Sequence, residues 1–170
     1  DHVLPAGGPD HMGEGCATVT WMQLNWHLLQ LTGEARFGDE IERTLYNHLL
    51  GAEDPNGGGV CYYMPLDGRK GFGKGISCCG SSVPRGIAMI PRLTWGSYDN
   101  GAAIVLYTEG EATITLPQGN SVQLKAETAF PATGLYSLTL TPNRDANFPL
   151  LLRVPAWTSS YRARVAGKTY

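Results

Sequence analysis

The sequence predicts an α+β protein in which a helical first half is followed by an antiparallel β-sandwich. Apolar residues recur with helical spacing up to about residue 90. Beyond about residue 100 they alternate one by one with polar residues, as half-buried strands require. The pattern changes near residues 97–101, so we expect two domains, residues 1–97 and residues 98–170.

The first predicted helix covers residues 17–32. Two neighbouring apolar stripes run along it, Trp21, Leu24, Leu28 and Leu31 in one and Met22, Trp26 and Leu29 in the other. A helix that is apolar over most of its circumference is typical of a protein interior, so its tryptophans are expected in a core rather than as platforms for sugars. Gly33 follows and suits the left-handed conformation that ends many helices.

Two further helices are expected in the first half. Residues 34–50 repeat an apolar residue every four positions, and the two-residue break before them predicts a tight antiparallel helical hairpin. The third helix is shorter. Ser81 or Ser82 is expected to cap it, Pro84 lies in its first turn, and Pro91 ends it.

The second half is predicted to contain six short strands separated by turn residues. Alternation or short apolar runs place them near residues 103–107, 111–116, 122–125, 136–141, 150–154 and 161–165. This is the pattern of an antiparallel β-sandwich.

Composition narrows the classes of function. Charged residues make up 16% of the 170, below the roughly 25% of an average soluble domain, which indicates that much of the surface is made to be covered. A net charge of −2 gives no electrostatic footprint for nucleic acid or an anionic membrane surface. No apolar run approaches the roughly 18 residues of a membrane span. Because the chain opens on Asp1, in what reads as a loop entered partway, we expect a segment of a longer protein.

Four cysteines are too few for a disulfide scaffold at this length, and the compartment, cytoplasmic or secreted, stays open. Cys16, two residues after Glu14, and the adjacent Cys78 and Cys79 supply three thiols and one carboxylate, a complete tetrahedral zinc set. Both groups are expected at the start of a helix, where thiol pKa values fall. Adjacent cysteines are an uncommon zinc spacing, however, so the pattern by itself favours buried thiols and an unrelated Cys16. Cys61 lies in a segment that is predicted to be a core strand.

The histidines divide into two pairs. His2 and His11 flank the loop before Glu14, and His11, three residues from a proposed ligand, is the better candidate to line a sugar pocket. The alternative is an exposed loop histidine. His27 and His48 lie on predicted helices, where neighbouring groups are expected to satisfy them.

Five short segments occur in a set order, namely residues 14–18, 38–47, 61–66, 78–86 and 152–157. Together they resemble glycoside hydrolase family 127, the β-L-arabinofuranosidase-type enzymes, over residues 10–168. The resemblance implies an (α/α)6 barrel followed by β-sandwich domains. The helical half would then be the C-terminal part of the barrel, because a closed barrel contains many more helices than three.

The resemblance also implies a site. Glu14, Cys16, Cys78 and Cys79 match the zinc ligands of the family, Cys78 its cysteine nucleophile, and Tyr62 a position near the sugar, although the loop from Tyr62 to Cys78 is shorter than the family's. The implied reaction is retaining hydrolysis of an arabinose-containing oligosaccharide or glycoconjugate. The family's acid/base glutamate falls upstream of Asp1, so this chain alone is expected to be inactive. Its first helix would pair with missing N-terminal barrel sequence or form a homo-oligomer.

Two other classes of function stay open. A non-catalytic carbohydrate-binding module would explain the β-rich half but would leave the cysteines unused. A structural zinc domain would use the cysteines without chemistry.

Overall fold

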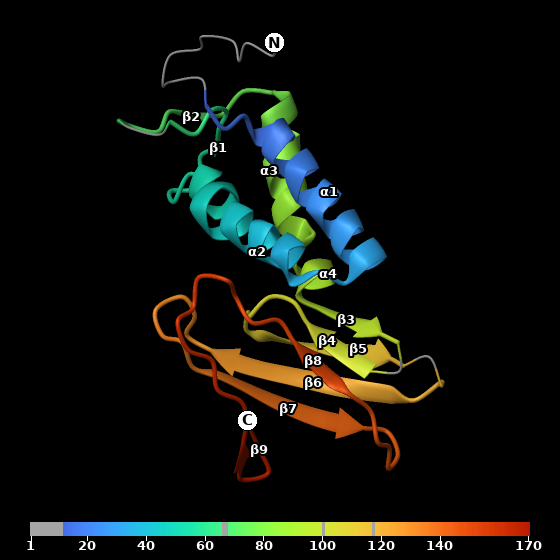
Figure 1. The fold of residues 1–170 in the computed structure, drawn as a ribbon. Coiled ribbons are helices and arrows are strands. Elements are labelled where there is room, and N and C mark those ends of the chain that lie inside the picture. The colour runs from blue at the N-terminus through green and yellow to red at the C-terminus, as the bar shows by residue number, and fades with distance from the viewer. Residues whose placement is uncertain (1–11, 66–67, 100, 117) are drawn as a thin grey trace, which may run out of the picture. The chain divides into compact units, whose positions relative to one another are not determined.

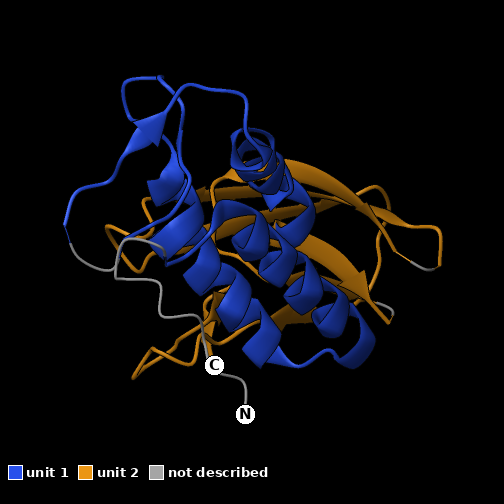
Figure 2. Cartoon of the chain, turned by 90° about the horizontal axis from the view of Figure 1, so that it is seen from above, with its two compact units in different colours: residues 1–93 blue, residues 94–170 orange. Residues whose placement is uncertain are grey.

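A computed structural model describes residues 12–65, 68–99, 101–116 and 118–170 of the chain. The chain divides into two compact units, Asp1–Leu93 and Thr94–Tyr170 (Figures 1 and 2). Helices dominate the first unit and strands the second, which confirms the predicted α+β class. The division falls before residue 97 because Trp95–Tyr98 forms a strand that pairs within the second unit.

The first helix, α1, covers Gly15–Thr32 and ends as predicted. Gly33 adopts the left-handed conformation, with a φ of 69°, and its N–H donates to the carbonyl of Leu29 at 2.8 Å. The helix begins two residues earlier than expected because the Glu14 carboxylate caps it, accepting the N–H of Ala17 at 2.7 Å.

Only one face of α1 is packed. Val19 and Met22 are fully buried, whereas Trp21 and Leu24 are each 47% exposed and Leu31 is 81% exposed. Within this chain Trp21 is therefore not in a core, and the uncovered side of α1 is the one expected to pair with further barrel sequence or with a second copy. None of the helices in the described part of the chain combines the length and apolar character needed to cross a membrane.

The second predicted helix is helical throughout but changes type. It consists of α2 (Ala35–Thr44), a π-helical turn η2 (Leu45–Leu49) and a 3-10 turn η3 (Leu50–Ala52). The predicted apolar stripe is the packed one, since Ile41, Leu45 and Leu49 are buried.

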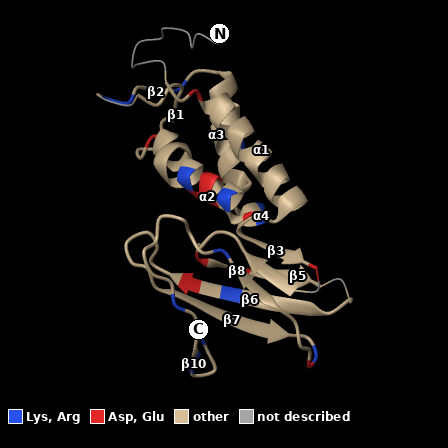
Figure 3. Ribbon diagram, viewed as in Figure 1, with Lys and Arg blue, Asp and Glu red and all other residues tan. Residues whose placement is uncertain are grey.

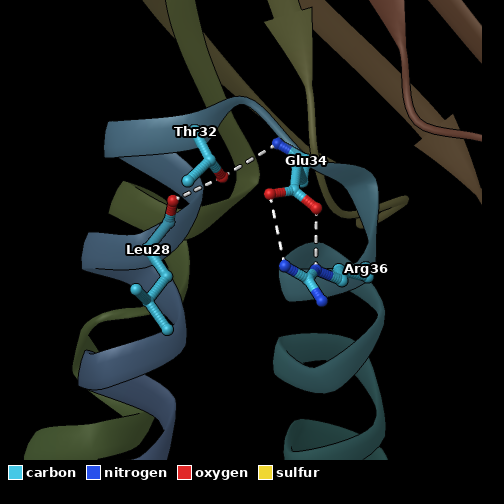
Figure 4. A network of polar contacts seen from close by, with 4 residues as sticks. All are labelled: Leu28, Thr32, Glu34 and Arg36. Atoms are coloured by element: carbon cyan, nitrogen blue, oxygen red, sulfur yellow. Dashed lines mark hydrogen bonds and ion pairs between the residues drawn. The ribbon is translucent and has the colours of Figure 1, made fainter.

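The turn between α1 and α2 closes through side chains (Figure 4). Thr32 Oγ1 donates to the carbonyl of Leu28 at 2.8 Å and accepts the N–H of Glu34 at 3.2 Å. Arg36 Nε pairs with the Glu34 carboxylate at 2.8 Å. The two helices are thereby joined by a short break and pack beside each other, as the hairpin prediction requires.

The third helix, α3, covers Cys78–Ala88 and begins earlier than predicted. Its cap is Ser77, whose side chain accepts the N–H of Gly80 at 3.0 Å, rather than Ser81 or Ser82. Cys78 and Cys79 are therefore its first two residues and do not precede it. Pro84 lies in the helix interior, where its missing N–H removes one backbone hydrogen bond. A short helix, α4 (Ile90–Thr94), follows.

A small β-hairpin lies between the second helix of the helical hairpin and α3. Strands β1 (Val60–Cys61) and β2 (Phe72–Gly73) pair antiparallel, and Cys61 is buried as expected. Directly after β1 the backbone pairs with the start of α1: Gly15 N–H donates to the Tyr62 carbonyl at 3.1 Å, and Met64 N–H to the Gly13 carbonyl at 3.2 Å. This pairing connects Tyr62 to the mouth of α1.

In its described residues, 94–99, 101–116 and 118–170, the second unit contains two three-stranded sheets and a terminal hairpin. The first sheet has the order β3 (Trp95–Tyr98), β4 (Gly101–Ile104), β8 (Leu150–Leu152); the second has the order β5 (Gly110–Thr115), β6 (Ser121–Thr128), β7 (Tyr136–Pro142); the hairpin joins β9 (Arg164–Val165) to β10 (Lys168–Thr169). The antiparallel prediction is confirmed except for β4 and β8, which pair parallel.

The two sheets face each other across an apolar core, as in a sandwich. Ile104 from one sheet and Leu124 from the other are buried together with Tyr107. The partly buried residues around them come from both sheets, namely Trp95, Ile114, Tyr136, Leu138, Leu140, Leu150 and Leu152. The register opposes Leu124 to Leu140, so the alternation in the sequence identified the inward face correctly.

Candidate metal centre

Four potential ligands from two distant parts of the chain converge in the first unit. One ligand atom from each of Glu14, Cys16, Cys78 and Cys79 lies within 4.8 Å of all the others. The sulfurs of Cys16 and Cys79 are 3.7 Å apart, and Cys79 Sγ donates to Glu14 Oε1 at 2.9 Å. Cys78 Sγ lies 3.8 Å from the same oxygen. This group could hold a metal ion, which the spacing along the sequence did not by itself favour.

The convergence depends on two helix N-termini that approach closely. Glu14 uses Oε2 to cap α1 and turns Oε1 toward the sulfurs, while the α3 cap places Cys78 and Cys79 in its first turn. Gly15 makes the approach possible. A Cβ at this position would lie 2.9 Å from Val83 Cγ2 and 3.1 Å from Cys79 Sγ, closer than side chains pack.

The three sulfurs differ in their access to solvent. Cys79 is fully buried, Cys16 is half-buried, and Cys78 is exposed. The hydroxyl of Tyr62 lies 3.1 Å from Cys78 Sγ. An incoming molecule can therefore reach Cys78 more readily than the other two thiols, and Tyr62 lies beside it.

The same surroundings set the pKa values of these groups. Burial, followed by the hydrogen bond to Glu14, raises the pKa of the Cys79 thiol to about 12. Hydrogen bonds from Tyr62 and then Cys16 lower the pKa of the Cys78 thiol. Burial acts to raise the pKa of Glu14, but the hydrogen bonds from Cys79 and the Ala17 N–H outweigh it, and the pKa falls. The metal-free group thus ionises most readily at Glu14 and at the exposed sulfur.

Of the four histidines, the structure describes His27 and His48. His11, the predicted sugar-pocket residue, is outside the described residues, as is His2. His48 Nδ1 lies 2.9 Å from Thr18 Oγ1, and burial, followed by the charge of Lys70, lowers its pKa. His27 is exposed on α1.

Sequence reasoning assigned Ser82 only a capping role, yet it contacts the group. Its side chain is buried, and its Oγ lies 3.2 Å from Cys16 Sγ and accepts from Arg85 Nη2 at 3.3 Å. Ser82 lies four and three residues after Cys78 and Cys79, and in a helix that begins at Cys78 this spacing places it on their face.

Comparison with known proteins identifies a family for each half of the chain. The family described as "Beta-L-arabinofuranosidase, GH127 catalytic domain" matches residues 3–92. The family described as "Beta-L-arabinofuranosidase, GH127 middle domain" matches residues 101–170. The first match contains all four members of the candidate metal centre.

Individual relatives give the same result. A non-reducing end β-L-arabinofuranosidase of Bifidobacterium longum subsp. longum is 23% identical over 92% of this chain and 26% of its own length. The crystal structure of a GH127 β-L-arabinofuranosidase from Geobacillus stearothermophilus T6 shares the fold, with a TM-score of 0.84 and 23% identity over 95% of this chain and 28% of that one. A second GH127 β-arabinofuranosidase structure has a TM-score of 0.79 and 27% identity over 92% and 28%. The chain spans about a quarter of the length of these relatives, and it belongs to glycoside hydrolase family 127.

Proposed function

We propose that this chain supplies the nucleophile side of the active site of a retaining glycoside hydrolase that acts on β-L-arabinofuranosides. In this proposal Glu14, Cys16, Cys78 and Cys79 bind zinc, Cys78 is the nucleophile, and Tyr62 contacts the sugar. The observation that carries the proposal is the convergence of four ligand atoms within 4.8 Å, with one of the three sulfurs exposed. The named activity of the Bifidobacterium relative supports the substrate class.

The donor set supports zinc. Two sulfurs that each lie about 2.3 Å from a tetrahedral zinc ion are about 3.8 Å apart. The sulfurs of Cys16 and Cys79 are 3.7 Å apart, so little movement is needed to accommodate the ion. Magnesium and calcium prefer oxygen ligands, and a set dominated by thiols argues against both.

The residues divide the chemical work between them. A bound zinc ion keeps its sulfur ligands deprotonated. Three thiolates and one carboxylate exceed the two positive charges of zinc, and this excess favours attack by Cys78 on an electron-poor carbon. Glu14, at the N-terminus of α1, and the buried Cys79, at the N-terminus of α3, hold the four ligands in place. Tyr62, within 3.1 Å of the reacting sulfur, helps to orient it.

The reaction proceeds in two displacements. Cys78 Sγ first bonds to the anomeric carbon while the bond from that carbon to the leaving oxygen breaks, and a carboxylic acid protonates that oxygen. Water then attacks the anomeric carbon and the carbon–sulfur bond breaks, while the same carboxylate takes the proton of the water. The sum is hydrolysis with retention, and Cys78 is restored.

Other parts of the enzyme complete the site in this proposal. The general acid comes from sequence beyond these 170 residues, so the chain alone does not turn over substrate.

The exposed side of α1 around Trp21 and Leu24 is covered by further helices of the barrel. The exposure of Trp21, Leu24 and Leu31 on a helix without charged residues supports this, because monomers rarely expose large apolar patches. If the chain alone sediments as a dimer that substitution of Trp21 by serine dissociates, a second copy covers the face instead.

Substitution of the nucleophile tests the proposal. In the full-length enzyme, Cys78→Ser is expected to lower kcat on an aryl β-L-arabinofuranoside at least a thousandfold without unfolding the protein. A β-L-arabinofuranose bearing a haloacetamide should alkylate Cys78, as mass spectrometry of peptides would show. Cys61→Ser is the matched control, since Cys61 is buried outside the cluster, and it should retain activity. Retained turnover in Cys78→Ser would overturn the proposal.

A second candidate, carbohydrate binding without catalysis, has one observation in its favour. The second unit contains a cavity of about 430 Å³, and its lining includes Phe130 and Trp157, whose rings stack with centroids 6.0 Å apart. Exposed aromatic rings are common in sugar sites. If an arabino-oligosaccharide binds in the absence of metal and Trp157→Ala abolishes binding, carbohydrate binding without catalysis is supported.

The same alkylation experiment tests a third function. If the haloacetamide sugar leaves Cys78 unmodified although zinc is bound, the cluster is a structural zinc site.

A further inference from the structure

The hydroxyl of Ser82 lies between a sulfur and a guanidinium group. Ser82 is only 6% exposed and sits one turn into α3, beyond the cysteine pair. Its Oγ is 3.2 Å from Cys16 Sγ, and Arg85 Nη2 donates to the same oxygen at 3.3 Å. Both contacts lie in the first unit, so their geometry belongs to one compact body.

The chemistry of these three groups orders their hydrogen bonds. A serine hydroxyl can donate one hydrogen bond and accept two, whereas a guanidinium group can only donate. Arg85 therefore occupies an acceptor position of Ser82 Oγ, and the hydroxyl proton is available for another partner. When Cys16 is a metal-bound thiolate, its sulfur can only accept, and Ser82 becomes the donor. The positive charge of Arg85 polarises that hydroxyl and strengthens its donation.

Cys16 and Cys78 are thus held in different ways. Cys16 is held by a buried hydroxyl on a helix, whereas exposed Cys78 is contacted by Tyr62, from the segment after β1. In the proposed function Cys78 would bond to the sugar, whereas Glu14, Cys16 and Cys79 would be the residues that hold the ion. We infer that Ser82, polarised by Arg85, is a positioning residue that keeps the Cys16 sulfur on the metal while Cys78 reacts; this rests on the proposed function.

Metal binding tests the inference without recourse to activity. The probe is Co²⁺ added to the metal-free full-length protein, with affinity measured by competition against a chelator and the sulfur-to-cobalt absorption bands recorded. Loss of a partner to a metal ligand typically weakens binding about 10- to 100-fold, so Ser82→Ala should bind cobalt at least tenfold more weakly, with shifted bands. Ser81→Ala is the matched control: Ser81 is the exposed neighbour whose hydroxyl donates to the Cys78 carbonyl at 3.0 Å, and its loss should change neither.

Arg85 provides an independent arm. Because Arg85 acts through Ser82, Arg85→Ala should weaken cobalt binding less than Ser82→Ala, and the double variant should match Ser82→Ala alone. Thermal unfolding of each metal-free variant checks that it is folded. Should Ser82→Ala fail to fold, Arg85→Ala decides, since its side chain is exposed.

The outcomes separate the two proposals. If the wild-type protein binds no cobalt, the metal centre itself is wrong and the inference falls with it. If the wild-type protein binds cobalt and Ser82→Ala binds it equally tightly with unchanged bands, the inference is wrong and the proposed function stands. Unchanged affinity in a folded Arg85→Ala variant removes the role of the guanidinium group.

Discussion

The neighbouring helices α1 and α2 present opposite kinds of outer surface. Charged residues recur along α2 (Figure 3), and on its outer face Glu40 and Arg43 pair at 2.9 Å, while Ile41 is fully buried. On α1 the unburied face has no charge and exposes Trp21 and Leu24. An outer face like that of α2 is suited to water, whereas that of α1 is suited to contact with protein. Periodicity therefore identifies apolar faces, but burial also requires an element to cover each of them.

The largest effect on stability is expected in the helical hairpin of α1 and α2. Ile41→Ala removes a fully buried side chain and should lower the free energy of unfolding by about 2–5 kcal/mol, because it leaves a cavity. Leu24→Ala is the comparison on α1 and should cost well under half as much, since Leu24 is 47% exposed. Chemical denaturation of the chain measures both. Equal losses would mean that the outer face of α1 is covered in solution, and the contrast between the helices would disappear.

A smaller effect is expected where α1 meets α3. Gly15→Ala places a Cβ 2.9 Å from Val83 Cγ2, and such overpacking typically costs about 1–3 kcal/mol. The variant should also bind cobalt more weakly, because the mouths of the two helices are forced apart. Gly71→Ala is the control, since a Cβ there meets nothing within 4 Å. A Gly15→Ala protein with unchanged stability and metal affinity would contradict the close approach of the two helices.

The smallest effect is expected at the turn that joins the two helices. Arg36 and Glu34 pair at 2.8 Å but are 70% and 48% exposed, so Arg36→Ala should change the free energy of unfolding by less than about 0.5 kcal/mol. Chemical denaturation of the wild-type protein and the variant at low and at high salt measures this difference in the free energy of unfolding. If the free energy of unfolding fell by more than about 1 kcal/mol, the polar turn of Figure 4, rather than the packing of apolar side chains, would align α1 with α2.

Local patterns accounted for much of the fold. The alternation in β6 and β7 predicted their inward faces because each strand has one buried side, and Gly33 ended α1 where its left-handed conformation was expected. The sequence did not determine the first residue of α3, because Ser77, Ser81 and Ser82 are all good N-caps and Pro84 favoured a later start. The parallel pairing of β4 with β8 joins residues far apart in the chain, which no local pattern encodes.

The candidate site was predictable in composition but not in geometry. Thiols and a carboxylate could be nominated by residue type, and the family resemblance selected among the alternatives. Their meeting depends on Gly15, whose missing side chain lets Val83 and Cys79 approach α1. The contact between Ser82 and Cys16 was missed because it depends on a helix that begins earlier than expected.

The backbone pairing between Gly13–Gly15 and Tyr62–Met64 has a consequence for how this region can change over evolution. Tyr62 is anchored before the chain enters the glycine-rich excursion that leads to Cys78, so insertions or deletions in that excursion need not displace the phenol from the sulfur. A library that varies residues 68–75 in length should therefore retain the contact between Tyr62 and Cys78 more often than one that alters the paired backbone.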